Sequence, residues 1–156
     1  MPYVEQAIVI NAPPAAVMEA LNDVESIPTW ATVPGTIDNV KGSGPGMTYE
    51  WHYYINNVRF NGKSEVLEQT ETSLITKTTG DVDSLWTINL SPAGKNSTAL
   101  NVVVEYSPPN IYVEILADIV LQQIQDPKVA RENTRRFKQM VEERVKLSEE
   151  QMLSNH

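Results

Sequence analysis

Apolar and polar residues alternate along much of the chain between residues 35 and 107. The clearest case is residues 47–56, where each odd position is apolar or aromatic. A period of two is typical of a strand with one buried face. Six such runs are separated by short gaps rich in Asn, Asp and Gly, which are typical of hairpin turns. They cover residues 35–42, 47–56, 58–69, 73–80, 84–91 and 97–107. The pattern predicts an antiparallel meander.

The same alternation assigns the side chains to two faces of the predicted sheet. The predicted inward face is apolar and strongly aromatic: Met47, Tyr49, Trp51, Tyr53, Ile55, Val58, Phe60, Ser64, Val66, Trp86, Ile88, Leu90, Leu100, Val102, Val104 and Tyr106. The opposite face carries Arg59, Lys63, Glu65, Asn89, Asn101 and Glu105, so it is predicted to be solvated. A bulge would invert this parity locally, and Asn61-Gly62 could hold one.

Before the meander, the sequence predicts one strand and two short helices. Residues 3–10 read as a strand, and "NAPPAAVMEALND" as a short helix that ends near Asn22. Asp23 could cap a second, very short helix that Pro28 ends. Trp30 then lies at a corner between Pro28 and Pro34. Because corners normally carry polar residues, we expect this large aromatic side chain to turn inward.

After the meander, the chain is predicted to be helical. Asn110 is a reasonable N-cap, and residues 111–125 carry only one polar stripe, so this helix must face a concave sheet or a second subunit. Pro127 kinks or restarts the helix. The continuation places Phe137, Met140, Val141 and Val145 inward, and it spaces Glu132/Arg136 and Glu142/Lys146 for i,i+4 pairs.

Composition then excludes several classes of partner. The chain has 156 residues, enough for one domain, which we expect to span residues 1–149 with a tail at 150–156. A net charge of -8 disfavours binding to nucleic acid or anionic membranes. Cysteine is absent, which excludes disulfides and thiolate chemistry. With no signal-like opening and no apolar run of about 18 residues, we expect a cytoplasmic protein without integral membrane association.

Few residues offer catalytic chemistry. His52 is predicted on the solvated face, Asp81 and Asp83 lie in a hairpin without further ligands, and "GSGPG" reads as a turn rather than a phosphate loop. We therefore expect neither a metal nor a cofactor. The polar groups predicted to face inward are Tyr49, Tyr53, Ser64, Glu68, Thr76 and Tyr106. A buried Glu68 could act as a general base, although its place beside a turn favours a solvated carboxylate.

The order of the predicted elements resembles that of the START/polyketide cyclase-like (SRPBCC) superfamily of helix-grip proteins. This superfamily includes the birch-pollen-allergen and coenzyme-Q-binding families. The resemblance rests on "VINAPPAAVMEALNDVESIPTWATVPG", "GPGMTYEWHY", "STALNVVVEYSPP" and "ENTRRFKQMVEE". It implies an α+β fold in which a curved seven-stranded antiparallel sheet grips a long C-terminal helix, with two short helices between strands 1 and 2. An apolar cavity would lie between sheet and helix.

The residues expected to line this cavity are Trp30, Met47, Tyr49, Trp51, Tyr53, Phe60, Ser64, Trp86, Val104, Tyr106, Ile115 and Ile119. We expect the protein to bind a hydrophobic small molecule such as a lipid, polyketide, quinone or other isoprenoid, as a carrier or sensor. The alternative is a polyketide-type cyclase or dehydratase that uses cavity tyrosines and water. A third interpretation assigns the apolar residues of 111–124 to a homodimer face.

Overall fold

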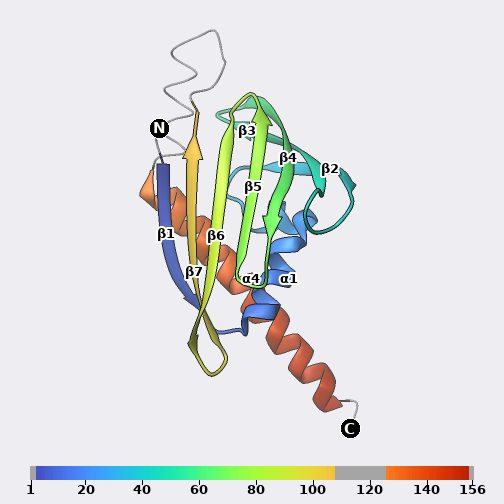
Figure 1. Ribbon diagram of the computed structural model, residues 1–156, viewed down its shortest axis with the longest axis vertical. Helices are drawn as coiled ribbons and strands as arrows, with labels where there is room; N and C mark the ends of the chain where they lie inside the picture. The colour runs from blue at the N-terminus through green and yellow to red at the C-terminus, as the bar shows by residue number, and fades with distance from the viewer. Residues whose placement is uncertain (1–2, 108–125, 155–156) are drawn as a thin grey trace.

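A curved antiparallel sheet of seven strands wraps around a long helix in the computed structural model, which describes residues 3–107 and 126–154 (Figure 1). The strands are ordered β1-β7-β6-β5-β4-β3-β2. In chain order the elements are β1 (Tyr3–Ile10), α1 (Pro14–Asn22), the 3-10 turn η1 (Val24–Ser26), α2 (Ile27–Trp30), β2 (Gly35–Lys41), β3 (Thr48–Ile55), β4 (Val58–Gln69), β5 (Ser73–Gly80), β6 (Ser84–Gly94), β7 (Ser97–Tyr106) and α4 (Pro127–Ser154). The predicted fold class is confirmed.

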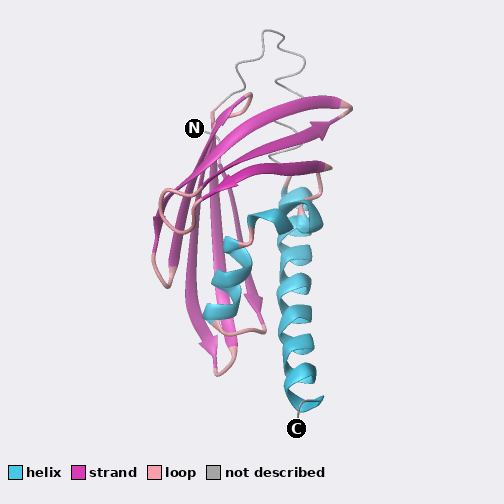
Figure 2. Ribbon diagram, turned by 90° about the vertical axis from the view of Figure 1, so that its right-hand side faces the viewer, coloured by secondary structure: helices cyan, strands magenta, loops and turns pink. Residues whose placement is uncertain are grey.

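Helix α4 lies on the concave side of the sheet, and the strands curve over its upper end (Figure 2). The Asp126 carboxylate accepts a hydrogen bond of 2.9 Å from the Lys128 backbone N–H, and Pro127 takes the first helical position. An Asp cap followed by Pro is favourable at the start of a helix. The Asp side chain accepts a hydrogen bond from an early backbone N–H, and Pro has no backbone N–H that would need a partner. Asn110 and the predicted helix at 111–125 lie outside the described residues.

The alternation correctly predicted which strand side chains are buried. Met47, Tyr49, Ile55 and Phe60 are all buried, whereas Tyr54 on the other parity is 43% exposed. On α4, the predicted inward residues Phe137 and Val141 are 4% and 1% exposed. The same core includes Ile10 and Val17, so sheet, short helices and α4 share one hydrophobic interior.

The bulge in β4 does not lie at Asn61-Gly62, where it was expected. Pairing of β3 with β4 is continuous from Thr48↔Glu65 to Ile55↔Val58. The register shifts instead between Val66 and Glu68 on the β5 side. An extra residue reverses the alternation, and Glu68 accordingly lies among the exposed residues. The carboxylate of Glu68 is therefore not an inward group.

Gly62 on β4 pairs directly with Trp51 on β3 and with Gly80 on β5. Gly80 has φ +142°, and a Cβ there would collide with the Asn61 carbonyl oxygen. Neither glycine contributes a side chain beside the Trp51 ring. Glycine at such positions allows close backbone approach, here between Gly80 and Asn61.

The second short helix differs from its prediction. Pro28 does not end a helix, because α2 begins at Ile27 and includes Pro28 in its first turn. Proline is tolerated there since its missing N–H needs no partner. Asp23 occupies the position before η1, but its side chain makes no capping bond and instead accepts a hydrogen bond of 2.7 Å from Arg144 on α4.

Ion pairs on α4 follow the expected spacing in one of two cases. Glu132 pairs with Arg136 at 3.1 Å, as predicted. Glu142 pairs with Lys138 at 2.6 Å rather than with Lys146. The reason is tertiary: the Glu142 carboxylate also accepts a hydrogen bond from the Asn11 backbone N–H, and Lys138 donates to the Val9 carbonyl. This pair therefore joins α4 to the end of β1.

Candidate functional site

A cavity of about 160 Å³ lies between the concave face of the sheet and α4. We call it the larger cavity. One water needs only ~10–15 Å³ of such space, so the cavity can take a larger molecule. Its described walls come from β1, α1, α2, the α2–β2 segment, β3, β5, β6, β7 and α4, and from the turn between β5 and β6. Six of its described lining residues are aromatic: Trp30, Trp51, Tyr53, Trp86, Tyr106 and Phe137.

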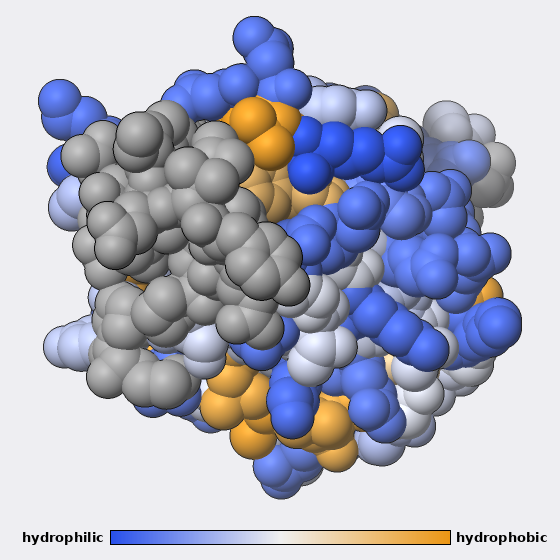
Figure 3. Space-filling model, turned by 90° about the horizontal axis from the view of Figure 1, so that it is seen from above, coloured by the Kyte–Doolittle hydropathy of each residue, from blue (hydrophilic) through white to orange (hydrophobic). Residues whose placement is uncertain are grey.

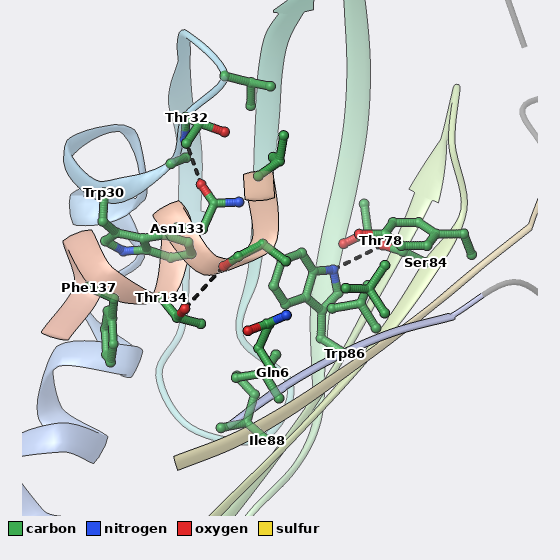
Figure 4. A pocket seen from close by; sticks show the side chains of 18 of the residues that line it. Gln6, Trp30, Thr32, Thr78, Ser84, Trp86, Ile88, Asn133, Thr134 and Phe137 are labelled. Carbon is green, nitrogen blue, oxygen red and sulfur yellow. Dashed lines mark hydrogen bonds between the residues drawn. The ribbon is translucent and has the colours of Figure 1, made fainter. Parts of the chain in front are cut away.

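None of the described residues that line the larger cavity is charged. Its polar lining groups are amides and hydroxyls: Gln6, Thr32, Tyr53, Thr78, Ser84, Tyr106, Asn133 and Thr134. Asn133 and Thr134 come from α4, whereas Thr78, Ser84 and Trp86 come from the sheet on the other side (Figure 4). An ion would lose its hydration here without gaining a countercharge, so the cavity favours neutral molecules.

A smaller cavity of about 70 Å³ adjoins the larger one. It lies against α1 and η1 and is lined by Met47, Tyr49, Ser64 and Thr76 of the sheet. The two cavities share six lining residues: Leu21, Trp30, Trp51, Thr78, Trp86 and Ile88. Asp23 is the one charged residue among the described lining of the smaller cavity.

Trp30 lies where the two cavities meet. It is the last residue of α2, and its half-buried indole lines both cavities. The rings of Trp30 and Phe137 are in edge-to-face contact, with their centroids 5.7 Å apart and their planes at 77°. Such T-shaped pairs are favourable because the positive ring edge meets the negative ring face. The contact holds α2 against α4.

A row of hydroxyl groups crosses the concave face in register. Tyr49 pairs with Ser64, Ser64 with Thr78, Thr78 with Ser84, and Ser84 with Tyr106 on five successive strands. Tyr49 hydrogen-bonds Ser64, and the Ser64 and Thr78 hydroxyls lie 2.7 Å apart. Farther along, the Trp86 indole donates to Ser84 at 3.1 Å. Several of these groups therefore satisfy one another within the wall.

The cavity tyrosines are held in their neutral form. Burial raises the pKa of Tyr53 to about 12, with a further rise from the nearby Asp81 carboxylate. Burial also raises the pKa of Tyr106, and the neighbouring Tyr53 adds to this. Burial raises the pKa of Tyr49, although its hydrogen bond with Ser64 acts in the opposite direction. At neutral pH these phenols can donate hydrogen bonds but cannot serve as bases.

One amide on α4 is fixed in orientation. The Asn133 Oδ1 atom accepts a hydrogen bond of 2.7 Å from the Thr32 backbone N–H. The Asn133 amide nitrogen points away from Thr32 and into the cavity (Figure 4). Gln6, on β1, also directs its amide into the cavity. Among the described residues, neither the Gln6 side chain nor the Asn133 amide nitrogen has a hydrogen-bond partner.

The structure brings most of the predicted site residues together. Trp30, Trp51, Tyr53, Trp86, Val104 and Tyr106 line the larger cavity, and Met47, Tyr49 and Ser64 line the smaller one. Phe60 lines neither cavity; it is 1% exposed, belongs to a separate cluster with Ile55 and Val82, and stacks on Tyr53 at 5.6 Å. Ile115 and Ile119 lie outside the described residues.

Sequence reasoning missed six polar lining residues of the larger cavity: Gln6, Thr32, Thr78, Ser84, Asn133 and Thr134. Signals were present for Gln6 and Asn133. Gln6 lies on the inward parity of β1, opposite Val102. Asn133 lies four residues before Phe137, and therefore on the same face of α4. The strand parity predicted inward polar groups within residues 47–106, and the same periodicity in residues 3–10 and in the C-terminal helix would have added Gln6 and Asn133.

The other candidate groups lie away from the cavities. His52 is on the convex side, with Nδ1 2.6 Å from Asn61 Oδ1 and Nε2 3.5 Å from Asp38 Oδ2. Asp81 and Asp83 accept hydrogen bonds from the backbone N–H groups of Asn61 and Gly80, which stabilises the turns. "GSGPG" is the loop between β2 and β3, with Gly42, Gly44 and Gly46 at positive φ.

Fold and site together define a helix-grip protein with an internal cavity suited to a small molecule. The family model for "polyketide cyclase / dehydrase and lipid transport" matches residues 1–146, and the chain belongs to this family. No curated protein matches the chain in sequence.

Solved structures with the same fold include three that cover most of the chain. The Zhui aromatase/cyclase from Streptomyces sp. R1128 has a TM-score of 0.75 at 13% identity, covering 92% of this chain and 95% of the other. The TTHA0849 protein of Thermus thermophilus has a TM-score of 0.73 at 19% identity, covering 90% of this chain and 97% of the other. A START superfamily protein from Mycobacterium smegmatis has a TM-score of 0.68 at 13% identity, covering 90% of this chain and 97% of the other. At these identities the likeness concerns the fold.

The surface contrasts with the interior. Seen from above, the described surface is mostly hydrophilic, with hydrophobic atoms in small patches (Figure 3). Within the described ranges, no helix is both long and apolar enough to cross a membrane. Among those same residues, no group of three or more His, Cys, Asp or Glu side chains is placed to hold a metal ion.

Proposed function

We propose that the protein binds a neutral, largely apolar small molecule in the larger cavity, as a carrier or sensor. The single observation that carries this proposal is the lining: six aromatic side chains, several amides and hydroxyls, and no charge among the described residues. Sites for small molecules combine apolar walls with a few polar groups in this way. Family and fold suggest hydrophobic ligand binding or polyketide cyclase activity, which agrees with this proposal.

The proposed site consists of the six predicted residues that line the larger cavity, together with Gln6, Asn133 and Phe137. The predicted residues Met47, Tyr49 and Ser64 line the adjoining smaller cavity. Trp30 has the central role, because it lines both cavities and its indole contacts Phe137. A ligand that occupies the larger cavity would contact Trp30, Trp86 and Tyr106 on three different elements. Ile115 and Ile119 remain part of the proposal as apolar contacts.

A cyclase or dehydratase activity is the second candidate, and one observation favours it. Tyr53 and Tyr106 line the same cavity, and burial raises the pKa of both phenols, so both can polarise a carbonyl as neutral donors. What such a reaction also needs is a base. His52 and Glu68 lie outside the cavity lining, and the phenols themselves stay protonated at neutral pH. This is why we place the carrier first.

The two functions are distinguished by native mass spectrometry of protein purified from its own organism, followed by organic extraction of whatever dissociates. The carrier proposal expects an apolar adduct at one-to-one stoichiometry, and it expects Trp30→Ala to weaken retention. A preparation that is consistently empty would contradict a tightly holding carrier. For an enzyme, the double substitution Tyr53→Phe/Tyr106→Phe would abolish turnover of the identified compound while binding survives.

A further inference from the structure

We infer that Asn133 is the residue that selects the ligand, by donating a hydrogen bond from its side-chain amide to a carbonyl oxygen of an uncharged molecule. The inference rests on the proposed function, because it concerns the same cavity. It goes further by naming the chemical class: a neutral ketone, aldehyde or quinone-type carbonyl attached to an apolar ring or chain, rather than a carboxylate or a pure hydrocarbon.

The orientation of the Asn133 amide follows from the chemistry of its partner. Amide oxygen and nitrogen are hard to distinguish by shape alone, so their assignment depends on the hydrogen-bond network. The partner here is the Thr32 backbone N–H, which can only donate. The atom 2.7 Å from it must therefore be the oxygen. It follows that the cavity receives the NH₂ group, which has two donors and no capacity to accept.

Rigidity makes this donor selective. Asn133 belongs to α4, where its backbone is fixed by helical hydrogen bonds, and its side chain is held by the bond to the α2–β2 segment. A positioned donor loses little entropy when a ligand arrives. Across the cavity lie the Trp86 ring and the hydroxyl row (Figure 4). A flat apolar body could rest against these rings while its carbonyl meets Asn133.

The neighbouring hydroxyl on α4 cannot take over this role. Thr134 Oγ1 donates to the backbone of its own helix, with Ala130 O at 3.1 Å and Arg131 O at 2.9 Å. It lines the same cavity as Asn133, one residue away, but its proton is already used. Thr134→Val is therefore a control that alters polarity at nearly the same place and leaves the proposed donor intact.

The absence of charge completes the assignment. A carboxylate could also accept from Asn133, but it would have to leave water without meeting a cation, because the described lining holds no Lys, Arg or His. Such transfer costs several kcal/mol unless the ion is paired or neutralised. A neutral carbonyl needs only the hydrogen bond.

The test uses three probes of nearly the same shape: 2-acetylnaphthalene, in which a carbonyl is present; 2-isopropenylnaphthalene, in which a methylene replaces the oxygen; and 2-naphthoate, which is charged. Binding to the full chain is measured by calorimetry at pH 8. We compare the ratio of the dissociation constants, hydrocarbon over ketone, because this ratio cancels effects of cavity shape. Asn133→Leu is expected to lower the ratio about tenfold, the size of one hydrogen bond.

Asn133→Asp is the second variant. It still accepts the Thr32 hydrogen bond and so preserves the contact between α4 and the α2–β2 segment, but it presents an acceptor to the ligand; we expect it to lower the ratio at least as far. Thr134→Val should leave the ratio unchanged, and 2-naphthoate should bind at least tenfold more weakly than the ketone.

A ratio that stays the same in both Asn133 variants would overturn this inference while leaving the proposed function standing. Failure of the unsubstituted protein to bind either neutral probe would overturn both.

Discussion

The larger and the smaller cavity share a wall, yet their polar groups are arranged differently. In the smaller cavity Tyr49, Ser64 and Thr78 hydrogen-bond one another across three strands. In the larger one, the Asn133 amide nitrogen and the Gln6 side chain are directed at open space, without partners among the described residues. Satisfied polar groups stabilise the sheet, whereas free ones offer recognition. This difference supports the proposal that the larger cavity is the binding site. The smaller one is chiefly part of the core, although Asn22 Oδ1 and Trp51 Nε1 in its lining are buried without a partner among the described residues.

The largest expected effect on stability comes from Phe137, which belongs to the hydrophobic core and also lines the larger cavity. This side chain is 4% exposed, contacts Trp30 and lines the larger cavity. Replacing it by Ala removes a buried ring, so the free energy of unfolding should fall by ~3–5 kcal/mol in urea denaturation. Phe137→Leu keeps most of the volume and should cost less. Equal stability of both variants and the unsubstituted protein would show that Phe137 is not part of the core.

An intermediate effect is expected at Ser64, in the smaller cavity. Ser64→Ala removes the partner of two buried hydroxyls, and the free energy of unfolding should fall by ~1–3 kcal/mol. Binding of 2-acetylnaphthalene in the larger cavity should be nearly unchanged. In the double variant Ser64→Ala/Thr78→Val, the loss should be smaller than the sum of the single losses, because both act on one hydrogen bond. Strict additivity, or a large loss of binding, would contradict the division between the two cavities.

Alkaline pH provides a probe of both cavities at once. Tyr49, Tyr53 and Tyr106 have pKa values raised above 10, so the unfolded chain releases these phenolic protons at lower pH than the folded one does. Their contribution to stability is therefore full at neutral pH and is lost as the pH rises above about 10. Ultraviolet titration should show Tyr53 ionising only near pH 12, and Tyr49 and Tyr106 ionising above the usual range of a phenol, or all three on unfolding. Ionisation of all tyrosines by pH 10.5 would contradict the burial.

The smallest effect is expected on the convex face. His52 contacts Asn61, Asp38 and Glu50 on the solvated side of the sheet. His52→Gln should change stability by no more than ~0.5 kcal/mol, as for most surface substitutions, and should leave probe binding unchanged. A loss of binding or turnover in this variant would mean that the convex face carries function.

Much of the fold could be predicted because its signals are local. The alternation in residues 47–56 determines which side chains face inward, and it applies wherever pairing is regular. Prediction failed where a tertiary constraint prevailed over the local pattern. The bulge fell between Val66 and Glu68 rather than at Asn61-Gly62, and Glu142 paired with Lys138 because Asn11 lies beside it.

The candidate site was less predictable than the fold, for a related reason. Aromatic residues stand out in a strand pattern, so Trp51, Tyr53 and Trp86 were found. Asn133 resembles any polar residue of an amphipathic helix until its contact with Thr32 is known. That contact joins residues 101 positions apart in the sequence, and local periodicity cannot predict such a pair. Polar residues on the apolar face of a helix or strand are the signal that would have found it.

The most direct test of the binding site uses the indole N–H signals in two-dimensional ¹H–¹⁵N NMR. The chain has three tryptophans, and all of them, Trp30, Trp51 and Trp86, line the larger cavity. Titration with 2-acetylnaphthalene should shift all three indole signals to saturation at one equivalent, while the backbone amides of His52 and Tyr54 stay in place. Shifts confined to the convex face, with the three indole signals unmoved, would contradict the assignment of the larger cavity as the binding site.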